Sequence, residues 1–252
     1  MHGKLEAKSH WSADGAYAHS SSNLVIGMTS RPLCPDCLRP TRACLCACVR
    51  TVASAVQLLV LQHPMEVGHA KNTARLLHLC VPGSRLEVGE CFEPATLQQL
   101  LHAPWPDQAA DATVHPVLLY PPTPMDPQLP VMRPPALPQE WLQQLPFLRL
   151  VLIDGTWRKS RKMLYLNPAL QQLPRLALHD LPQGRYAIRK AHAPGQLSSF
   201  EAGALALAQL HAWDDDNPHV QALARSFEAA MGHHQTLQGL SICPATTTVP
   251  AS

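Results

Sequence analysis

A short polar segment, Asp154-Gly155-Thr156-Trp157, directly follows the apolar run Leu148–Ile153. A run of this kind predicts a buried strand, and open α/β sheets bind ligands beyond the carboxyl ends of such strands. There Asp154 offers a carboxylate, and Gly155 allows a ligand to come close to the backbone. Thr156 adds a hydroxyl group, and Trp157 adds a large stacking face. The segment therefore predicts a ligand site, with a capped helix that presents a solvated cationic face as the competing interpretation.

Four cations follow this segment within five residues: Arg158, Lys159, Arg161 and Lys162. Such a local density of positive charge suits phosphate groups. The formal net charge of the whole chain is only +2 with histidine neutral, so charge alone does not indicate a nucleic-acid partner. His63 and Glu66 follow another apolar run, where they could line the mouth of the site or cap a helix.

Five of the eight cysteines lie within residues 31–50. Cys34, Cys37, Cys44 and Cys46 have the spacing C-x2-C-x6-C-x-C, which suits four thiolates around a tetrahedral Zn²⁺. Four protein ligands leave no open position, so such a zinc would be structural. Three arginines could offset the negative charge of the cluster: Arg31, Arg39 and Arg42. Cys48 could replace Cys46 as the fourth ligand, and the alternative for the whole cluster is a loop of reduced thiols.

The elements that must hold these residues alternate between strands and helices. Strands are predicted at residues 55–61, 85–88, 114–120, 148–153 and 175–178. Helices are predicted at residues 67–79, 94–101, 157–166, 198–213 and 220–234, with a further short helix near 140–145. This alternation favours an α/β fold with a mostly parallel sheet covered by helices. The proline-rich residues 121–146 predict a loop or covering segment.

The length of 252 residues and the hydrophobic content of 46% fit one α/β domain with appendages. We expect a flexible tail at residues 1–30, a zinc-binding segment at 31–50, a catalytic domain at 51–240 and a tail at 241–252. Neither a signal-peptide pattern nor a run of about 18 apolar residues appears, so we expect a cytoplasmic protein without a membrane partner. The oligomeric state stays open, and we favour a monomer.

The ordered motifs resemble those of the DTW-domain family. The family's Asp-x-Thr-Trp signature corresponds here to Asp154–Trp157, and the four-cysteine cluster also matches. Further similar segments are Gln62–Glu66 with Asn72-Thr73-Ala74 after it, Leu118–Pro121, Tyr186–Lys190 and Leu197–Ala202. In the last of these, Ser199 replaces the usual threonine but keeps the hydroxyl group. The resemblance covers most of residues 31–215, and the ordered set is more specific than any single motif.

This resemblance implies a tRNA-uridine aminocarboxypropyltransferase with a SPOUT-like, knotted α/β fold. Such an enzyme transfers the 3-amino-3-carboxypropyl group of S-adenosylmethionine to N3 of a uridine and releases methylthioadenosine. The bacterial members that carry a zinc cluster act on the tRNA variable loop. An RNA methyltransferase of the same architecture is the first alternative, and a non-enzymatic, zinc-stabilised RNA-binding module is the second. The tRNA species and the exact uridine stay open.

Residue roles are carried over from the resemblance together with the chemistry. Asp154 would accept the N3 proton as a general base or, alternatively, would hold the ammonium group of the donor. Donor contacts are expected from Leu119, Tyr120, Pro121, Gly155, Thr156, Trp157, Leu197, Ser198 and Ser199. Free amides at the start of the helix near Ser198 would suit the donor's carboxylate, and Trp157 would stack on adenine or belong to the core. Contacts to tRNA are expected from His63, Glu66, Arg158, Lys159, Arg161, Lys162, Arg185, Arg189 and Lys190.

Overall fold

The computed structural model describes residues 32–69, 71–106, 108–121, 127–128, 130–178 and 197–237. Contacts divide the chain into Met1–Arg31 and Pro32–Ser252, and all of the described residues belong to the second unit. The tails predicted at residues 1–30 and 241–252 therefore lie outside the described part of the chain.

In the described ranges, five parallel strands form one sheet in the order β2-β1-β4-β3-β5. The strands are β1 (Gln57–Gln62), β2 (Arg85–Val88), β3 (His115–Leu119), β4 (Leu148–Asp154) and β5 (Arg175–Leu176). Because every pair is parallel, the carboxyl ends of the strands share one edge of the sheet. The predicted α/β class and parallel sheet are confirmed, and β2 has the predicted bounds.

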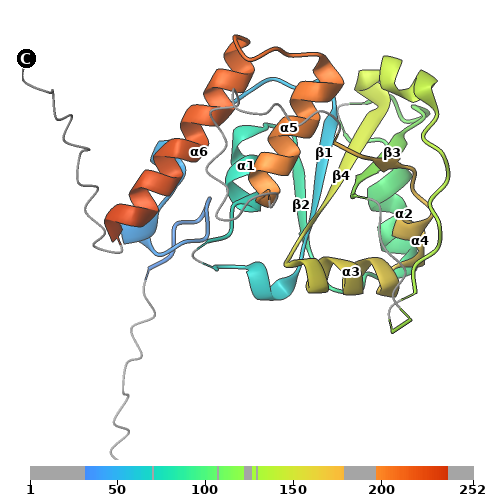
Figure 1. Ribbon diagram of the computed structural model, residues 1–252, viewed down its shortest axis with the longest axis horizontal. Helices are drawn as coiled ribbons and strands as arrows, with labels where there is room; N and C mark the ends of the chain where they lie inside the picture. The colour runs from blue at the N-terminus through green and yellow to red at the C-terminus, as the bar shows by residue number, and fades with distance from the viewer. Residues whose placement is uncertain are drawn as a thin grey trace, which may run out of the picture. The chain divides into compact units, whose positions relative to one another are not determined.

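Helices cover both faces of the sheet, as Figure 1 shows. One face carries α1 (Ala74–Cys80), α5 (Ser199–His211) and α6 (Pro218–Leu237), and the other carries α2 (Pro94–His102), α3 (Trp157–Leu166) and α4 (Pro168–Gln171). Successive residues of β1 alternate between the two cores: Leu58 and Val60 face the first, whereas Leu59 and Leu61 face the second. A strand covered on both faces is largely apolar, which is why the strand prediction at residues 55–61 rested on a near-continuous apolar run.

The four-cysteine segment packs onto the first of these cores. Its two 3-10 turns are η1 (Thr41–Ala43) and η2 (Cys46–Cys48), and both contact α6. Leu45 is buried in the same apolar cluster as Leu76 of α1, and the Arg50 amide donates to Ser226 Oγ of α6 at 2.9 Å. The segment is thus held by the helical layer of the sheet.

The helix predicted at residues 67–79 begins only at Ala74. Residues 64–66 form a 3-10 turn, η3 (Pro64–Glu66), and Gly68 has a φ of +71°, which a right-handed helix does not allow. The chain therefore turns before α1, and Asn72 and Thr73 point their side chains at other elements. The short helix predicted near 140–145 is replaced by two 3-10 turns, η4 (Gln139–Gln143) and η5 (Leu145–Phe147).

The connection between β5 and α5 includes residues 179–196, which lie outside the described part of the chain. The predicted knot depends on the path of that connection, so the knotted topology stays a prediction. Within the described ranges, no helix is both long enough and apolar enough to cross a lipid bilayer.

Candidate functional site

Asp154 ends β4 and is buried, with an exposed fraction of 4%. Among the described residues, three neutral side chains donate hydrogen bonds to its carboxylate. Gln62 Nε2 and Asn72 Nδ2 donate to Oδ2 at 2.9 and 2.6 Å, and Ser199 Oγ donates to Oδ1 at 2.6 Å. The three donors come from β1, from the turn before α1 and from the first residue of α5. Asp154 is therefore the point at which three distant parts of the chain meet.

Parallel pairing of β1 with β4 brings two of these groups together. The register places Gln62 opposite Asp154, and the next amide, that of His63, donates to the Asp154 carbonyl at 2.9 Å. Gln62 and Asp154 are the last residues of β1 and β4. Their side chains therefore lie next to each other at the carboxyl edge of the sheet. Gln62 and Asn72 lie in motifs on which the family resemblance rested, yet their role as partners of Asp154 was not predicted. A polar residue at the end of an apolar run was the only signal for Gln62.

The residue after Asn72 ties α5 to the same turn. Thr73 Oγ1 accepts a hydrogen bond from the Phe200 amide at 3.2 Å, and Ser198 caps α5 by accepting from the Glu201 amide. Glu201 returns a hydrogen bond to the Ser198 amide at 2.8 Å, which completes a capping box. The Ser198, Phe200 and Glu201 amides already have partners, so this helix start offers the donor's carboxylate fewer amides than expected, and a contact between them stays a prediction.

Gly155 and Thr156 form the turn that leads from Asp154 into α3. Thr156 Oγ1 accepts from the Lys159 amide at 3.4 Å and caps the helix. A Cβ atom on Gly155 would lie 3.2 Å from the Cβ of Lys159 and 3.6 Å from that of His63. Glycine therefore lets α3 start close to the end of β1.

Trp157 is half exposed, at 50%, so the interpretation of this side chain as core is wrong. Its ring stacks on Tyr120, with centroids 5.3 Å apart and planes 14° apart. Tyr120 lies just beyond β3 and is buried, which raises the pKa of its hydroxyl group. That hydroxyl group lies 3.2 Å from Ser160 Oγ of α3. The arrangement presents Trp157 as an aromatic surface at the carboxyl edge of the sheet.

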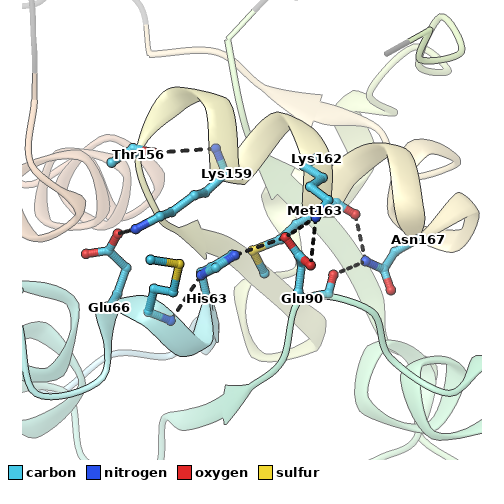
Figure 2. Close-up of polar contacts among 9 residues, drawn as sticks. His63, Glu66, Glu90, Thr156, Lys159, Lys162, Met163 and Asn167 are labelled. Carbon is cyan, nitrogen blue, oxygen red and sulfur yellow. Dashed lines mark hydrogen bonds and ion pairs between the residues drawn. The ribbon is translucent and has the colours of Figure 1, made fainter. Parts of the chain in front are cut away.

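Ion pairs join α3 to the two loops below it, as Figure 2 shows. Lys159 Nζ lies 2.8 Å from Glu66 Oε1, and Lys162 Nζ lies 2.9 Å from Glu90 Oε1. Arg158 is exposed. Arg161 is 6% exposed, so the expectation that it contacts phosphates on the surface is corrected. Two of the four cations of the predicted patch are therefore already neutralised by carboxylates.

His63 acts as a cap, which was one of its two predicted roles. Its Nδ1 accepts a hydrogen bond from the Met65 amide at 3.1 Å, so a neutral ring carries its proton on Nε2. Nε2 then donates to Glu90 Oε1 at 3.1 Å. Hydrogen bonds from Lys162 first, and from His63 second, lower the pKa of the Glu90 carboxyl group. Glu66, by contrast, pairs with Lys159 and has no capping role.

Asn167, just after α3, completes this network and was missed in the sequence. Its Nδ2 donates to the Glu90 carbonyl at 2.9 Å, and its Oδ1 accepts from the Phe92 amide at 2.9 Å. Figure 2 shows Lys162, from the middle of α3, and Asn167, just after its last residue, both reaching Glu90. The loop after β2 is therefore fixed to α3, although nothing in its sequence marked it as part of the site.

The sulfur atoms of Cys34, Cys37, Cys44 and Cys46 all lie within 4.8 Å of one another. This grouping identifies Cys46 as the fourth member of the cluster and leaves Cys48 out. Backbone amides of Cys37 and Asp36 lower the pKa of the Cys34 thiol to about 7, whereas burial and the neighbouring sulfurs raise the pKa of Cys46. Four thiolates at this spacing need a cation to ionise together, so the donor set fits a tetrahedral metal such as Zn²⁺.

The other residues predicted to contact the donor lie in or beside β3 and α5. Leu119 is buried at the end of β3, Pro121 is exposed, and Leu197 is half-buried just before α5. The structure brings Tyr120, Trp157 and Ser199 to the carboxyl edge, together with Asp154. Arg185, Arg189 and Lys190, predicted to contact tRNA, lie outside the described residues.

Comparisons with known proteins agree on one family. A family model described as the DTW domain matches residues 31–235. A protein of Drosophila melanogaster named tRNA-uridine aminocarboxypropyltransferase 2 is 30% identical over 206 residues, covering 74% of this chain and 71% of its own length. A Mus musculus protein of the same name is 27% identical over 79% of this chain, which spans 62% of the mouse protein. An Arabidopsis thaliana protein named tRNA-uridine aminocarboxypropyltransferase A is 27% identical over 53% of this chain and 50% of its own length. No solved structure shows a significant match.

Proposed function

The chain belongs to the DTW-domain family, and we propose that it is a tRNA-uridine aminocarboxypropyltransferase that uses S-adenosylmethionine as donor. The observation that carries the proposal is the buried carboxylate of Asp154, held by Gln62, Asn72 and Ser199 at the carboxyl edge of a parallel sheet. The signature residues of the family thus sit where α/β proteins bind small molecules.

The reaction joins uridine N3 to the carbon of the aminocarboxypropyl group. The bond from that carbon to the sulfonium sulfur breaks, its electron pair stays on sulfur, and neutral methylthioadenosine leaves. The proton of N3 must also leave, because the nitrogen is a poor nucleophile while it is protonated. We assign this proton to Asp154.

The hydrogen bonds around Asp154 fit this assignment. A carboxylate offers about four lone-pair sites, and three are taken by the donors described above. Among the described residues Oδ1 accepts only from Ser199, so the remaining site lies on this oxygen. One further hydrogen bond, from uridine N3 or from the ammonium group of the donor, would complete the shell.

Binding of tRNA would involve the exposed face of α3. Arg158 and Lys162 are exposed on this helix, and Trp157 adds an aromatic surface for an unstacked base. Glu66 and Glu90 hold Lys159 and Lys162, so phosphate groups would have to compete with carboxylates for these cations. Arg185, Arg189 and Lys190 are proposed as further contacts. We also propose a structural Zn²⁺ on the four cysteines and a SPOUT-like knot near the donor.

The identity of the released nucleoside tests this function. Protein incubated with unmodified tRNA and S-adenosylmethionine should release methylthioadenosine, and the tRNA should gain the mass of an aminocarboxypropyl group. Release of S-adenosylhomocysteine would instead support a methyltransferase. Salt-sensitive tRNA binding without any donor binding in calorimetry would support an RNA-binding module.

A further inference from the structure

Arg39 lies inside the four-cysteine segment, between Cys37 and Cys44, and is only 8% exposed. Its backbone belongs to the loop that surrounds the sulfurs, because the Cys34 amide donates to the Arg39 carbonyl at 2.8 Å. The neighbouring Leu38 has a φ of +56°, and its amide donates to the Cys34 carbonyl at 2.9 Å. The conformation of the cysteine loop therefore fixes the backbone of Arg39 and the direction in which its side chain leaves the loop.

The side chain of Arg39 leaves this loop and reaches the residue that holds Asp154. Its Nη2 donates to the Asn72 carbonyl at 2.6 Å, and Asn72 Nδ2 donates to Asp154 Oδ2 at 2.6 Å. Asn72 is 8% exposed and Asp154 is 4% exposed, so water does not compete freely for either bond. Two short, buried hydrogen bonds thus connect the cysteine loop to the carboxylate.

The same turn also fixes the starts of two helices. Asn72 Oδ1 accepts from the Arg75 amide at 3.2 Å in α1, and Thr73 Oγ1 accepts from the Phe200 amide in α5. The cavity beside Arg39 and Asn72 has a volume of about 10 Å³, which is room for roughly one water molecule. A shift of the Asn72 carbonyl would therefore move the donor to Asp154 and the start of α5 together.

We propose that Arg39 is a positioning residue that couples the state of the four-cysteine cluster to the geometry of Asp154. It acts through Asn72 and touches neither the donor nor the RNA. An occupied cluster holds Arg39 against the Asn72 carbonyl, and a disordered cluster releases it. Only the catalytic consequence rests on the proposed function, whereas the mechanical coupling does not depend on it.

The first test compares Arg39→Gln with Arg42→Gln, which removes an exposed arginine from the same segment. Hydrogen exchange is followed by NMR at the Arg75 and Phe200 amides and at the β1 amides. Arg39→Gln should speed exchange of the two reporter amides by about tenfold and leave β1 unchanged, since a charged hydrogen bond is lost locally. Arg42→Gln should change neither. Should Arg39→Gln fail to fold, Arg39→Lys serves in its place, with a smaller effect at the same amides.

The second test asks whether the coupling runs through Arg39. Removal of the metal from the wild-type protein by a chelator should speed hydrogen exchange at the Arg75 and Phe200 amides about as much as Arg39→Gln does. In Arg39→Gln, chelation should add less than about twofold at these amides, because the link is already broken. Three results would each overturn the proposal. The exchange rates of the Arg75 and Phe200 amides could stay unchanged in Arg39→Gln, or the β1 amides could speed up equally. The effects of chelation and substitution could also be fully additive.

A kinetic measurement follows the catalytic consequence. Arg39→Gln should lower kcat for tRNA modification by about tenfold, with KM for tRNA within about twofold of wild type and an unchanged metal content. A loss of metal in this variant would overturn a positioning role and indicate a ligand-supporting role. If no transfer occurs even with the wild-type protein, the proposed function fails while the exchange results still decide the coupling.

Discussion

The two ends of β4 carry opposite charges in opposite settings. Arg149, at the amino end, is fully buried, and Gln57 of β1 accepts hydrogen bonds from its Nε and Nη2 at 2.8 and 2.6 Å. Asp154, at the carboxyl end, accepts from Gln62 of the same strand. The register places each glutamine directly opposite its charged partner, so the two ends have the same local pattern.

The remaining partners distinguish the two ends. Arg149 donates to the backbone carbonyls of Leu100 and Ala103, at the carboxyl end of α2, where the helix dipole favours a cation. Burial lowers the pKa of its guanidinium to about 10. Asp154 instead receives side-chain donors, and the half-exposed Trp157 follows three residues later. Arg149 is thus enclosed by Gln57 and two main-chain carbonyls, whereas Asp154 is held by three side chains near a half-exposed tryptophan, so we expect Arg149 to act on stability and Asp154 on the reaction.

The largest expected effect is the loss of activity in Asp154→Asn. The amide cannot accept the N3 proton, so turnover should fall by at least about 100-fold, while donor affinity stays within a few-fold of wild type. Single-turnover kinetics and calorimetry measure the two quantities, and Asp111→Asn, an exposed acid, is the matched control. An equal loss of turnover and donor affinity would assign Asp154 to binding of the donor's ammonium group.

At the amino end of β4, the substitution Arg149→Met should lower the stability of the fold and leave the activity unchanged. The change leaves Gln57 and two carbonyls without their donor, and the free energy of unfolding should fall by about 3 kcal/mol. Activity per folded molecule should stay within about twofold. Urea denaturation measures the first, and Arg85→Met, the other arginine stacked on Trp105, should cost less than about 1 kcal/mol. A folded Arg149→Met protein without activity would remove the distinction between the two ends.

Ser199→Ala tests the shell around Asp154 more finely. Removal of the donor to Oδ1 frees the carboxylate to rotate, and kcat should fall by about tenfold. Ser199→Thr keeps the hydroxyl group and should retain activity within about threefold. Equal activities of the alanine and threonine variants would show that the hydroxyl group does not orient Asp154.

Glu90→Gln should have the smallest effect, because Glu90 lies in the outer network at the carboxyl edge. The variant should melt about 2 °C below wild type near neutral pH. Since the pKa of Glu90 is lowered in the folded state, its contribution is present above the unfolded value and disappears as pH falls through the folded one. Thermal melts should therefore converge below about pH 4. A difference that persists in acid would point to packing instead of charge.

The strands were predictable because both faces of the sheet are covered, which makes Leu150–Ile153 of β4 and Leu58–Leu61 of β1 unbroken apolar runs. Because Asp154 directly follows such a run in the sequence, its location at the carboxyl end of a buried strand could be predicted. The sequence did not reveal that Asn72 would reach it, because that contact depends on the turn made by Gly68. The choice of Cys46 over Cys48 depends on a 3-10 turn with no distinct pattern.

Buried Arg149 and the paired lysines show a second limit of the sequence. The sequence shows one arginine within an apolar run, but it does not show whether the guanidinium reaches solvent or the end of a helix. Similarly, the basic residues after Trp157 predicted one phosphate-binding patch, but Glu66 and Glu90 arrive from other elements. Three-dimensional neighbours set the local charge in both cases.

We propose that the edge around Asp154 transfers an aminocarboxypropyl group and not a methyl group. A donor labelled with ¹⁴C in its carboxyl group and ³H in its methyl group tests it directly, with unmodified tRNA as acceptor. We expect ¹⁴C to enter the tRNA while ³H leaves with methylthioadenosine, and we expect Asp154→Asn to slow both greatly. Transfer of ³H to the tRNA, with ¹⁴C left on the released S-adenosylhomocysteine, would contradict it.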